Sequence, residues 1–240
     1  MSDSKVPLKG LIVAIDGPAG SGKSTVTHHL ARKLSYIHID TGALYRAIAL
    51  RAMELNMNLE DGKSIGELAL QSQLEFQWIK DEDGMDKNQV FIDGRNVSNL
   101  IRTPEVSMAA SKISAYPEVR DALLDLQRKF GDQGGVVLEG RDIGTVVFPN
   151  AHVKFFLTAS VESRARRRQI EFESKGNYMD FEEIKKQVVV RDKQDTERKA
   201  APLKKASDAI EVDTTSLTIE QVVEKLEEEV RKREKVLRKK

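Results

Sequence analysis

Gly17-Pro18-Ala19-Gly20-Ser21-Gly22-Lys23-Ser24 is the stretch that decides the fold, because it matches the G-x-x-x-x-G-K-[ST] pattern of a phosphate-binding loop. The apolar run Leu11–Ile15 precedes it and indicates a buried strand. After it, apolar residues recur at helical spacing, at Val26, Leu30 and Leu34. The motif therefore joins a strand to a helix, which is the setting in which such a loop works.

The chemistry of this loop predicts that it binds the phosphates of ATP. Glycines let backbone N–H groups turn toward phosphate oxygens, and the following helix presents its first N–H groups and the positive end of its dipole to the same anion. Lys23 adds a charge near the β- and γ-phosphates, and the Ser24 hydroxyl is placed to ligate Mg²⁺. The alternative is a glycine-rich turn that binds nothing. The predicted ATP-binding residues are Gly17, Pro18, Ala19, Gly20, Ser21, Gly22, Lys23, Ser24 and Thr25.

The composition is that of an ordinary globular protein. The 240 residues suit one domain with an insertion, or two small domains. The 39 Lys and Arg residues nearly balance the 38 Asp and Glu, so nothing argues for bulk nucleic-acid binding. The absence of cysteine excludes disulfides, thiolate metal sites and cysteine nucleophiles, and it fits a cytoplasmic location. We expect neither a signal peptide nor a membrane-spanning run.

Five short runs of apolar or alternating residues predict the strands of one sheet: Leu11–Ile15, Tyr36–Ile39, Gly135–Leu138, Val153–Leu157 and Ala209–Val212. Helical patterns fill most gaps between them, so we expect an α/β fold with a five-stranded parallel sheet covered by helices on both faces. Ligands of such sheets bind beyond the carboxyl ends of the strands. Polar residues follow four of the runs, namely Asp16, Asp40, Glu139 and Thr158.

The middle of the chain departs from this alternation. Leu74–Trp78 and Gln89–Ile92 alternate apolar and polar residues, and a turn signal at Asp81–Gly84 separates them. We predict a small antiparallel meander inserted between Leu59 and about Arg102. Two helices opened by proline follow it, Pro104–Ser114 and Pro117–Phe130.

The C-terminal end predicts an amphipathic helix. Thr218 and Gln221 have the spacing of a capping box at its start. The tail Arg231–Lys240 is nearly all charged, and we expect it to fray. One face of the helix is apolar, at Ile219, Val222, Val223, Leu226 and Val230.

A phosphate-binding loop alone does not identify the reaction, because GTPases, motor ATPases and small-molecule kinases share it. The chain has no N-K-x-D or T-K-x-D element that would read guanine. The strand Gly135–Leu138 is followed by Glu139-Gly-Arg-Asp142 rather than by an aspartate directly. A motor-type metal-holding acid is therefore not clearly present.

Arginines are concentrated late in the chain, at Arg164, Arg166, Arg167, Arg168, Arg191 and Arg198. Phosphoryl transfer needs positioning and positive charge on the moving group, and arginine supplies both. We therefore predict a mobile, arginine-rich lid over Arg164–Arg198 that closes on the phosphates. For Arg164–Arg168 the alternative is a solvated basic face of a helix.

Segments spread over nearly the whole chain carry a family resemblance: Ile15–Thr25, Asp40–Arg46, Val90–Gly94, Ile101–Val106, Ser111–Arg120, Glu139–Thr145 and Arg191–Arg198. Together they resemble the bacterial cytidylate kinases, which are nucleoside monophosphate kinases. Short adenylate kinases and shikimate kinases share the loop but not the other segments. Thr41 stands where serine is also common, which is a conservative change.

The resemblance implies a role for each matching residue. Ser111, Arg120 and Asp142 would read the cytosine edge, where an aspartate can accept from the exocyclic amine. Asp195 with Arg191 would hold the sugar. The acceptor phosphate or the transferred group would be bound by Arg46, Arg141 and Arg198. The implied CMP-binding set is Thr41, Arg46, Ser111, Arg120, Arg141, Asp142, Arg191, Asp195 and Arg198, and the implied catalytic set is Lys23, Arg141, Arg191 and Arg198.

Several polar residues have a structural interpretation instead of, or beside, a functional one. Asp40 is also expected to cap a helix over Thr41–Leu55. No general base is expected, because the acceptor is already a phosphate anion. The four histidines lack metal spacing and are expected to be structural or surface residues: His28, His29, His38 and His152.

The expected activity is transfer of the γ-phosphoryl group of ATP, with Mg²⁺, to CMP or dCMP. The resemblance implies a core formed by residues 8–59, 105–159 and 199–240, a monophosphate-binding insert at about 60–104 and a lid at about 160–198. One alternative is a kinase for another acceptor, such as UMP. Another is a non-enzymatic, nucleotide-dependent RNA-associated protein that uses its basic tail as the contact. We expect a monomer with no nucleic-acid or membrane partner.

Overall fold

The computed structural model describes residues 10–80, 86–174 and 176–237. Their contacts form two compact units. The first, the sheet unit, comprises residues up to His38 and from Phe130 onward; the second, the insert unit, comprises Ile39–Lys129. The predicted insert at 60–104 falls within the insert unit and the predicted lid at 160–198 within the sheet unit. Their boundaries as separate domains stay a prediction.

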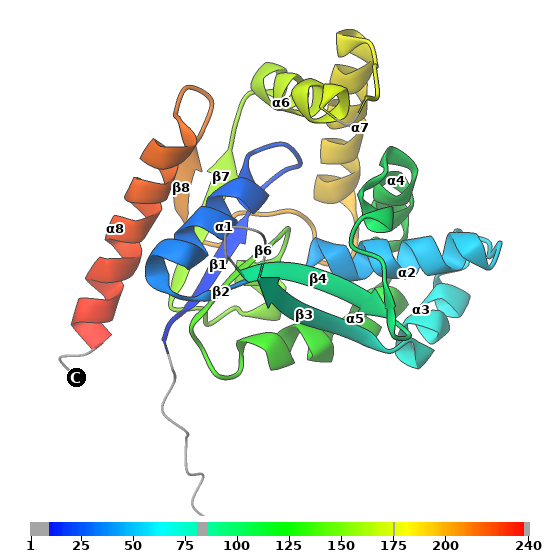
Figure 1. The fold of residues 1–240 in the computed structure, drawn as a ribbon, viewed down its shortest axis with the longest axis horizontal. Coiled ribbons are helices and arrows are strands. Elements are labelled where there is room, and N and C mark those ends of the chain that lie inside the picture. Colours follow the sequence, from blue (N-terminus) through cyan, green and yellow to red (C-terminus); the bar gives the residue numbers. More distant parts are fainter. Residues whose placement is uncertain (1–9, 81–85, 175, 238–240) are drawn as a thin grey trace, which may run out of the picture. The chain divides into compact units, whose positions relative to one another are not determined.

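The sheet unit is built on a five-stranded sheet in the order β2-β6-β1-β7-β8 (Figure 1). The central strand β1 (Ile12–Asp16) pairs in parallel with β6 (Val136–Gly140) and β7 (Val153–Thr158), and β7 pairs in parallel with β8 (Ile210–Asp213). β2 (Ile37–Asp40) lies beside β6 at the edge. The predicted α/β fold with a parallel sheet is confirmed, and the predicted strands differ from these only at their ends.

One face of this sheet is covered by α1 (Lys23–Leu34) and α8 (Ile219–Leu237), which pack against each other. The predicted range of the first helix, from Lys23 to Leu34, is confirmed. The apolar face of α8 is buried in the same core as the strands, except at Ile219, which is exposed. The buried residues of this face are Val222, Val223, Leu226 and Val230.

Both ends of α8 follow from local hydrogen bonds and charges. The capping box is confirmed, since Gln221 N donates to Thr218 Oγ1 (3.2 Å) and Thr218 N donates to Gln221 Oε1 (3.0 Å). The expectation that the charged tail frays is wrong for residues 231–237, because the helix continues to Leu237. Arg231 pairs with Glu227 and Glu234 one turn away on either side, and such pairs support an exposed helix. Residues 238–240 lie outside the described part of the chain.

The segment predicted as a lid forms a helix pair, α6 (Val161–Glu173) and α7 (Phe181–Glu197). Both helices begin at a side-chain cap: Ser160 Oγ accepts from Ser163 N, and Asp180 Oδ1 accepts from the first N–H groups of α7. The two helices share a small core of their own, formed by Ala165, Phe172, Ile184 and Val188.

The insert unit contains the predicted meander. β3 (Leu74–Lys80) pairs antiparallel with β4 (Asp86–Ile92), and β4 pairs antiparallel with β5 (Arg95–Asn96). The turn predicted at Asp81–Gly84 lies outside the described residues. The helical elements are α2 (Gly42–Glu54), α3 (Gly62–Gln71), η1 (Leu100–Arg102) and the two that open at proline, α4 (Pro104–Ile113) and α5 (Pro117–Gly131), whose last residues belong to the sheet unit.

Within the described residues, no helix is long and apolar enough to cross a bilayer. The same part of the chain contains no group of three or more His, Cys, Asp or Glu side chains arranged to hold a metal ion.

Candidate active site

The phosphate-binding loop runs from the end of β1 into the first turn of α1. Gly17 has a φ of 151°, and a Cβ there would lie 2.1 Å from the carbonyl oxygen of Leu157, so this approach requires glycine. Gly22, the residue before α1, is left-handed, and no side chain caps the helix. The first N–H groups of α1 are thus presented at the loop, where the oxygens of a phosphate can accept them.

Lys23 is buried at the start of α1, and its Nζ donates to the carbonyl oxygen of Pro18 (2.7 Å). Burial, together with the guanidinium of Arg141, lowers the pKa of Lys23 well below its ordinary value, while the carboxylates of Glu139 and Asp16 oppose this. A phosphate oxygen beside Nζ would favour the ammonium form in the same way as these carboxylates do. The lysine is therefore placed to bind an anion.

Ser24 and Glu139 bring a hydroxyl and a carboxylate together beside the loop. Ser24 Oγ donates to Glu139 Oε2 (2.8 Å), and His38 Nε2 lies 2.9 Å from Glu139 Oε1. Mg²⁺ prefers oxygen ligands, and it is commonly held by a loop serine and one carboxylate together with phosphate oxygens. This donor set therefore fits Mg²⁺.

Glu139, one of the polar residues expected beyond the strand ends, has no assigned role in the sequence prediction, and the structure places its carboxylate beside the phosphate-binding loop. The predicted strand ends at Leu138, whereas β6 extends to Gly140 and contains Glu139. The usable signal is the acidic residue that directly follows an apolar run. A carboxylate that could ligate a metal is thus present as a glutamate within the strand, and its metal-binding role stays a prediction.

Asp16 ends β1 and joins the loop to the segment that follows β6. Its carboxylate accepts from the backbone N–H groups of Ile143 (2.8 Å) and Gly144 (2.7 Å), the first residues of the short helical turn η2 (Ile143–Val147). Burial raises the pKa of Asp16 to about 6, although both amides act to lower it. A buried carboxyl thereby fixes the turn that begins just after Asp142.

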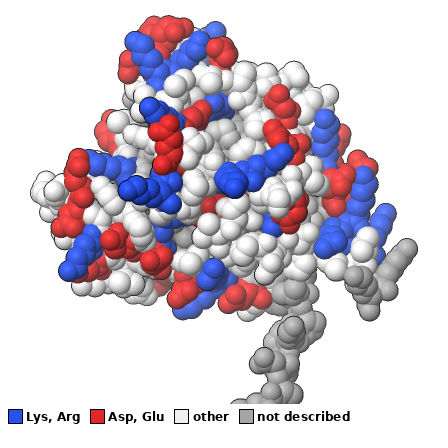
Figure 2. Space-filling model, turned by 180° about the vertical axis from the view of Figure 1, so that it is seen from behind, with Lys and Arg blue, Asp and Glu red and all other residues white. Residues whose placement is uncertain are grey.

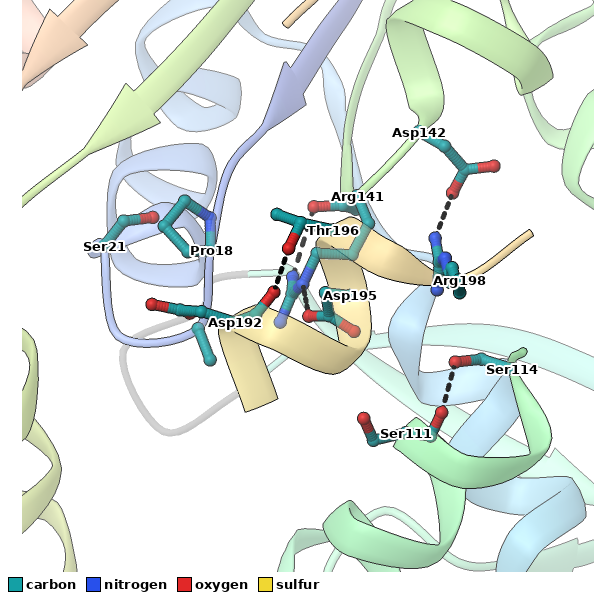
Figure 3. Close-up of polar contacts among 12 residues, drawn as sticks. Pro18, Ser21, Ser111, Ser114, Arg141, Asp142, Asp192, Asp195, Thr196 and Arg198 are labelled. Atoms are coloured by element: carbon teal, nitrogen blue, oxygen red, sulfur yellow. Dashed lines mark hydrogen bonds and ion pairs between the residues drawn. The ribbon is translucent and has the colours of Figure 1, made fainter. Parts of the chain in front are cut away.

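Two ion pairs join the end of β6 to α7 and the residue after it (Figure 3). Arg141 Nε donates to Asp195 Oδ2 (2.8 Å), and Arg198 Nη2 lies 3.6 Å from Asp142 Oδ1. Burial opposes ionisation of Asp195, but the guanidinium groups of Arg141 and Arg191 outweigh burial and lower its pKa. The structure thus brings these predicted site residues together within the sheet unit.

Two further predicted residues, Thr41 and Arg46, lie at the start of α2 in the insert unit. Thr41 is the N-cap of α2, so the expectation that Asp40 caps this helix is wrong. The helix starts one residue later than predicted, and Asp40 Oδ2 instead accepts from Arg46 Nη2 (2.7 Å). This ion pair holds the guanidinium of Arg46 beside the first turn of the helix.

Ser111 and Arg120 are brought together around Ser114 in the insert unit. Ser114 Oγ donates to the carbonyl oxygen of Ser111 (2.9 Å; Figure 3), and Arg120 Nη1 donates to the carbonyl oxygen of Ser114 (3.2 Å). Arg120 is buried, and its guanidinium carbon lies 5.4 Å from the centre of the Tyr45 ring. The predicted convergence of this pair with Asp142 on one base stays a prediction.

Comparison with known proteins agrees with these motifs. A family model described as cytidylate kinase matches residues 13–232. The chain belongs to the cytidylate kinase family. The cytidylate kinase of Citrifermentans bemidjiense is 50% identical over 230 residues, covering 96% of this chain and 97% of the relative. That of Carboxydothermus hydrogenoformans is 51% identical over 225 residues, covering 94% and 99%. Among solved structures, a gluconokinase from Sinorhizobium meliloti 1021 covers 98% of this chain and 99% of its own at 15% identity, with a TM-score of 0.48.

In this member of the cytidylate kinase family, arginines of α6 bind the main chain of the phosphate-binding loop. Arg164 pairs with Asp192 (2.5 and 2.8 Å) and donates to the carbonyl oxygen of Ala19 (3.2 Å). Arg167 Nη1 donates to the carbonyl oxygen of Gly20 (3.4 Å). The alternative of a solvated basic face does not hold for Arg164, which is 4% exposed. The other two arginines lie over rings, Arg166 over Phe181 and Arg168 over Phe172. A lid function for this segment stays a prediction.

Proposed function

We propose that the protein transfers the γ-phosphoryl group of ATP to CMP or dCMP, giving ADP and CDP or dCDP. The observation that carries the proposal is the family match over residues 13–232, with relatives named cytidylate kinase that are about half identical along nearly their full length. The geometry supports it, because Asp16 connects a phosphate-binding loop directly to a cluster of arginine–carboxylate pairs.

At the ATP end, the residues Gly17–Thr25 would bind the phosphates through the N–H groups of the loop and of α1. Lys23 would contact the β- and γ-phosphates. Ser24 and Glu139 would hold Mg²⁺, which supplies charge neutralisation at these two phosphates. Because the acceptor is an anion, the chain needs no general base and has to provide position and positive charge.

At the acceptor end, Asp142 would accept from the exocyclic amine of cytosine, and Ser111 and Arg120 would satisfy the rest of its edge. Uracil carries a carbonyl where cytosine has the amine, so two acceptors would face each other at a cost of about 1–3 kcal/mol. Asp195 and Arg191 would hold the sugar. The phosphate and the group in transfer would be held by Arg141, Arg198, Arg46 and Thr41.

We also propose that α6 and α7 act as a lid, because closure would exclude water that otherwise hydrolyses ATP. A cytoplasmic location fits this reaction, since its substrates are cytoplasmic metabolites, and we propose a monomer. Figure 2 shows Lys and Arg side chains interleaved with Asp and Glu over one face of the molecule. In the part of the chain that the structure describes, this face therefore lacks the continuous basic stripe that a nucleic-acid contact uses.

The experiment that tests the function measures ADP release with CMP, dCMP, UMP and AMP as acceptors. We expect CMP and dCMP to support turnover far better than UMP or AMP. Lys23→Ala should abolish transfer and keep the circular dichroism of the folded protein. Asp142→Ala should raise the KM for CMP and reduce the preference for CMP over UMP. Equal turnover with UMP in the unmodified protein would contradict the proposed acceptor, and unchanged discrimination in Asp142→Ala would remove that residue from base recognition.

A further inference from the structure

His38 is a histidine that the proposed reaction leaves without a role, yet it contacts the carboxylate beside the phosphate-binding loop. Ser24 Oγ donates to Oε2 of Glu139 (2.8 Å), and His38 Nε2 lies within hydrogen-bond distance of Oε1 of the same carboxylate (2.9 Å). Since a carboxylate accepts and the imidazole nitrogen can donate, Nε2 carries the hydrogen in this contact. Each oxygen of Glu139 is therefore engaged from a different element, α1 on one side and β2 on the other.

The fold holds this arrangement from several directions. His38 lies on β2, the sheet neighbour of β6, and Ile37 N donates to the carbonyl oxygen of Gly135 just before β6 (2.8 Å). The His28 ring of α1 meets the His38 ring edge-on, with centroids 6.1 Å apart. The side chains of Glu139 and His38 are only 5% and 18% exposed. The imidazole is thus a fixed group facing a fixed carboxylate.

We propose that His38 is a positioning residue for the metal-side carboxylate. Its Nε2–H holds Oε1 of Glu139, and this orients Oε2 toward Ser24 Oγ, so that hydroxyl and carboxylate face the same point. Partners of this kind, one bond removed from a metal ligand, commonly change metal affinity by 10–100-fold when they are removed. The inference rests on the proposed role of Ser24 and Glu139 in holding Mg²⁺, and it does not depend on which monophosphate is the acceptor.

A pair of amide variants tests the bond itself. In His38→Gln the side-chain nitrogen takes nearly the place of imidazole Nε2 and can donate to Oε1, whereas the shorter His38→Asn side chain does not reach. His38→Leu removes the donor. The readout is the Mg²⁺ concentration that gives half-maximal enhancement of mant-ADP fluorescence, with no acceptor present. His29→Leu is the matched control, because it removes an exposed imidazole of helix α1. The ring of His29 contacts that of His28.

We expect His38→Asn and His38→Leu to raise this Mg²⁺ concentration about tenfold, and His38→Gln and His29→Leu to stay within about twofold of the unmodified protein. The affinity for mant-ADP in EDTA should be the same in all of them, because the bond acts on the metal ligand. Equal Mg²⁺ requirements for His38→Asn and His38→Gln would overturn the role of His38 while leaving the metal site intact. If Glu139→Gln and Ser24→Ala also left the Mg²⁺ requirement unchanged, the assigned metal site would fail, and the role of His38 with it. Turnover with CMP, measured separately, would still decide the proposed reaction.

Discussion

Asp16→Asn should make the stability of the protein less sensitive to pH and lower its activity, and the structure gives the size of the effect. Burial raises the pKa of Asp16 from 3.8 to about 6. A shift of about two units corresponds to about 3 kcal/mol of free energy between the two protonation states. Because the folded state binds this proton more tightly, the free energy of unfolding falls as pH rises from about 4 to about 6. Asparagine resembles the protonated acid and does not titrate, so the variant escapes this loss.

The assay is urea denaturation of both proteins at pH 4, 5, 6 and 7. Between pH 4 and pH 7 the difference in free energy of unfolding should shift by about 3 kcal/mol in favour of the variant, on top of a constant offset from the amide contact that asparagine loses. Turnover should fall, because asparagine offers one oxygen to the two amides of Ile143 and Gly144 and removes a charge that favours protonated Lys23. A difference in free energy of unfolding that stays constant from pH 4 to pH 7 would refute this reasoning. An increase in the stability of the wild-type protein relative to the variant as pH rises would refute it as well.

Three further substitutions test separate parts of the structure. Asp195→Asn leaves the Arg141 guanidinium without its carboxylate, so KM for CMP should rise by an amount equivalent to about 1.5–3 kcal/mol with little change in KM for ATP. Gly131→Ala places a Cβ 2.3 Å from the Phe148 ring; urea midpoints should fall by the equivalent of about 1–3 kcal/mol, with substrate affinities unchanged. Arg164→Ala removes the support of the phosphate-binding loop, so KM for ATP should rise, and an unchanged KM would show that the loop holds its shape without this arginine.

Features that depend on neighbours a few residues away could be predicted from the sequence. The phosphate-binding loop fixes the end of one strand and the start of α1, and the predicted helix agrees with the observed one. The cap formed by Thr218 and Gln221 and the proline starts at Pro104 and Pro117 act within a single turn. Alternating patterns in Leu74–Ile92 likewise give the antiparallel meander, since the side-chain period of a strand is two.

The pairing of charges across long stretches of chain could not be predicted in this way. Arg164 has its carboxylate partner 28 residues away, and Ser24 meets Glu139 across 115 residues. A run of arginines has the same sequence pattern whether it faces water, a main-chain carbonyl or an aromatic ring, so the sequence alone leaves the solvated face open as an alternative. The tail after Arg231 shows the same limit, because its helix depends on which charges lie one turn apart.

The pairing of each arginine with an aspartate at the candidate acceptor site, Arg141 with Asp195 and Arg198 with Asp142, affects how an acceptor would bind. Buried ion pairs such as Arg198–Asp142 add little net stability, because desolvation offsets most of their attraction. They do hold the guanidinium and the carboxylate at one place. In the proposed site, we expect an incoming phosphate to replace Asp142 or Asp195 on an arginine, while an amine or a hydroxyl of the nucleotide takes the carboxylate that is released. Few charges would be newly desolvated in this exchange of partners. We therefore expect an acceptor that offers an anion and a donor together to bind better than inorganic phosphate, which supplies only the anion.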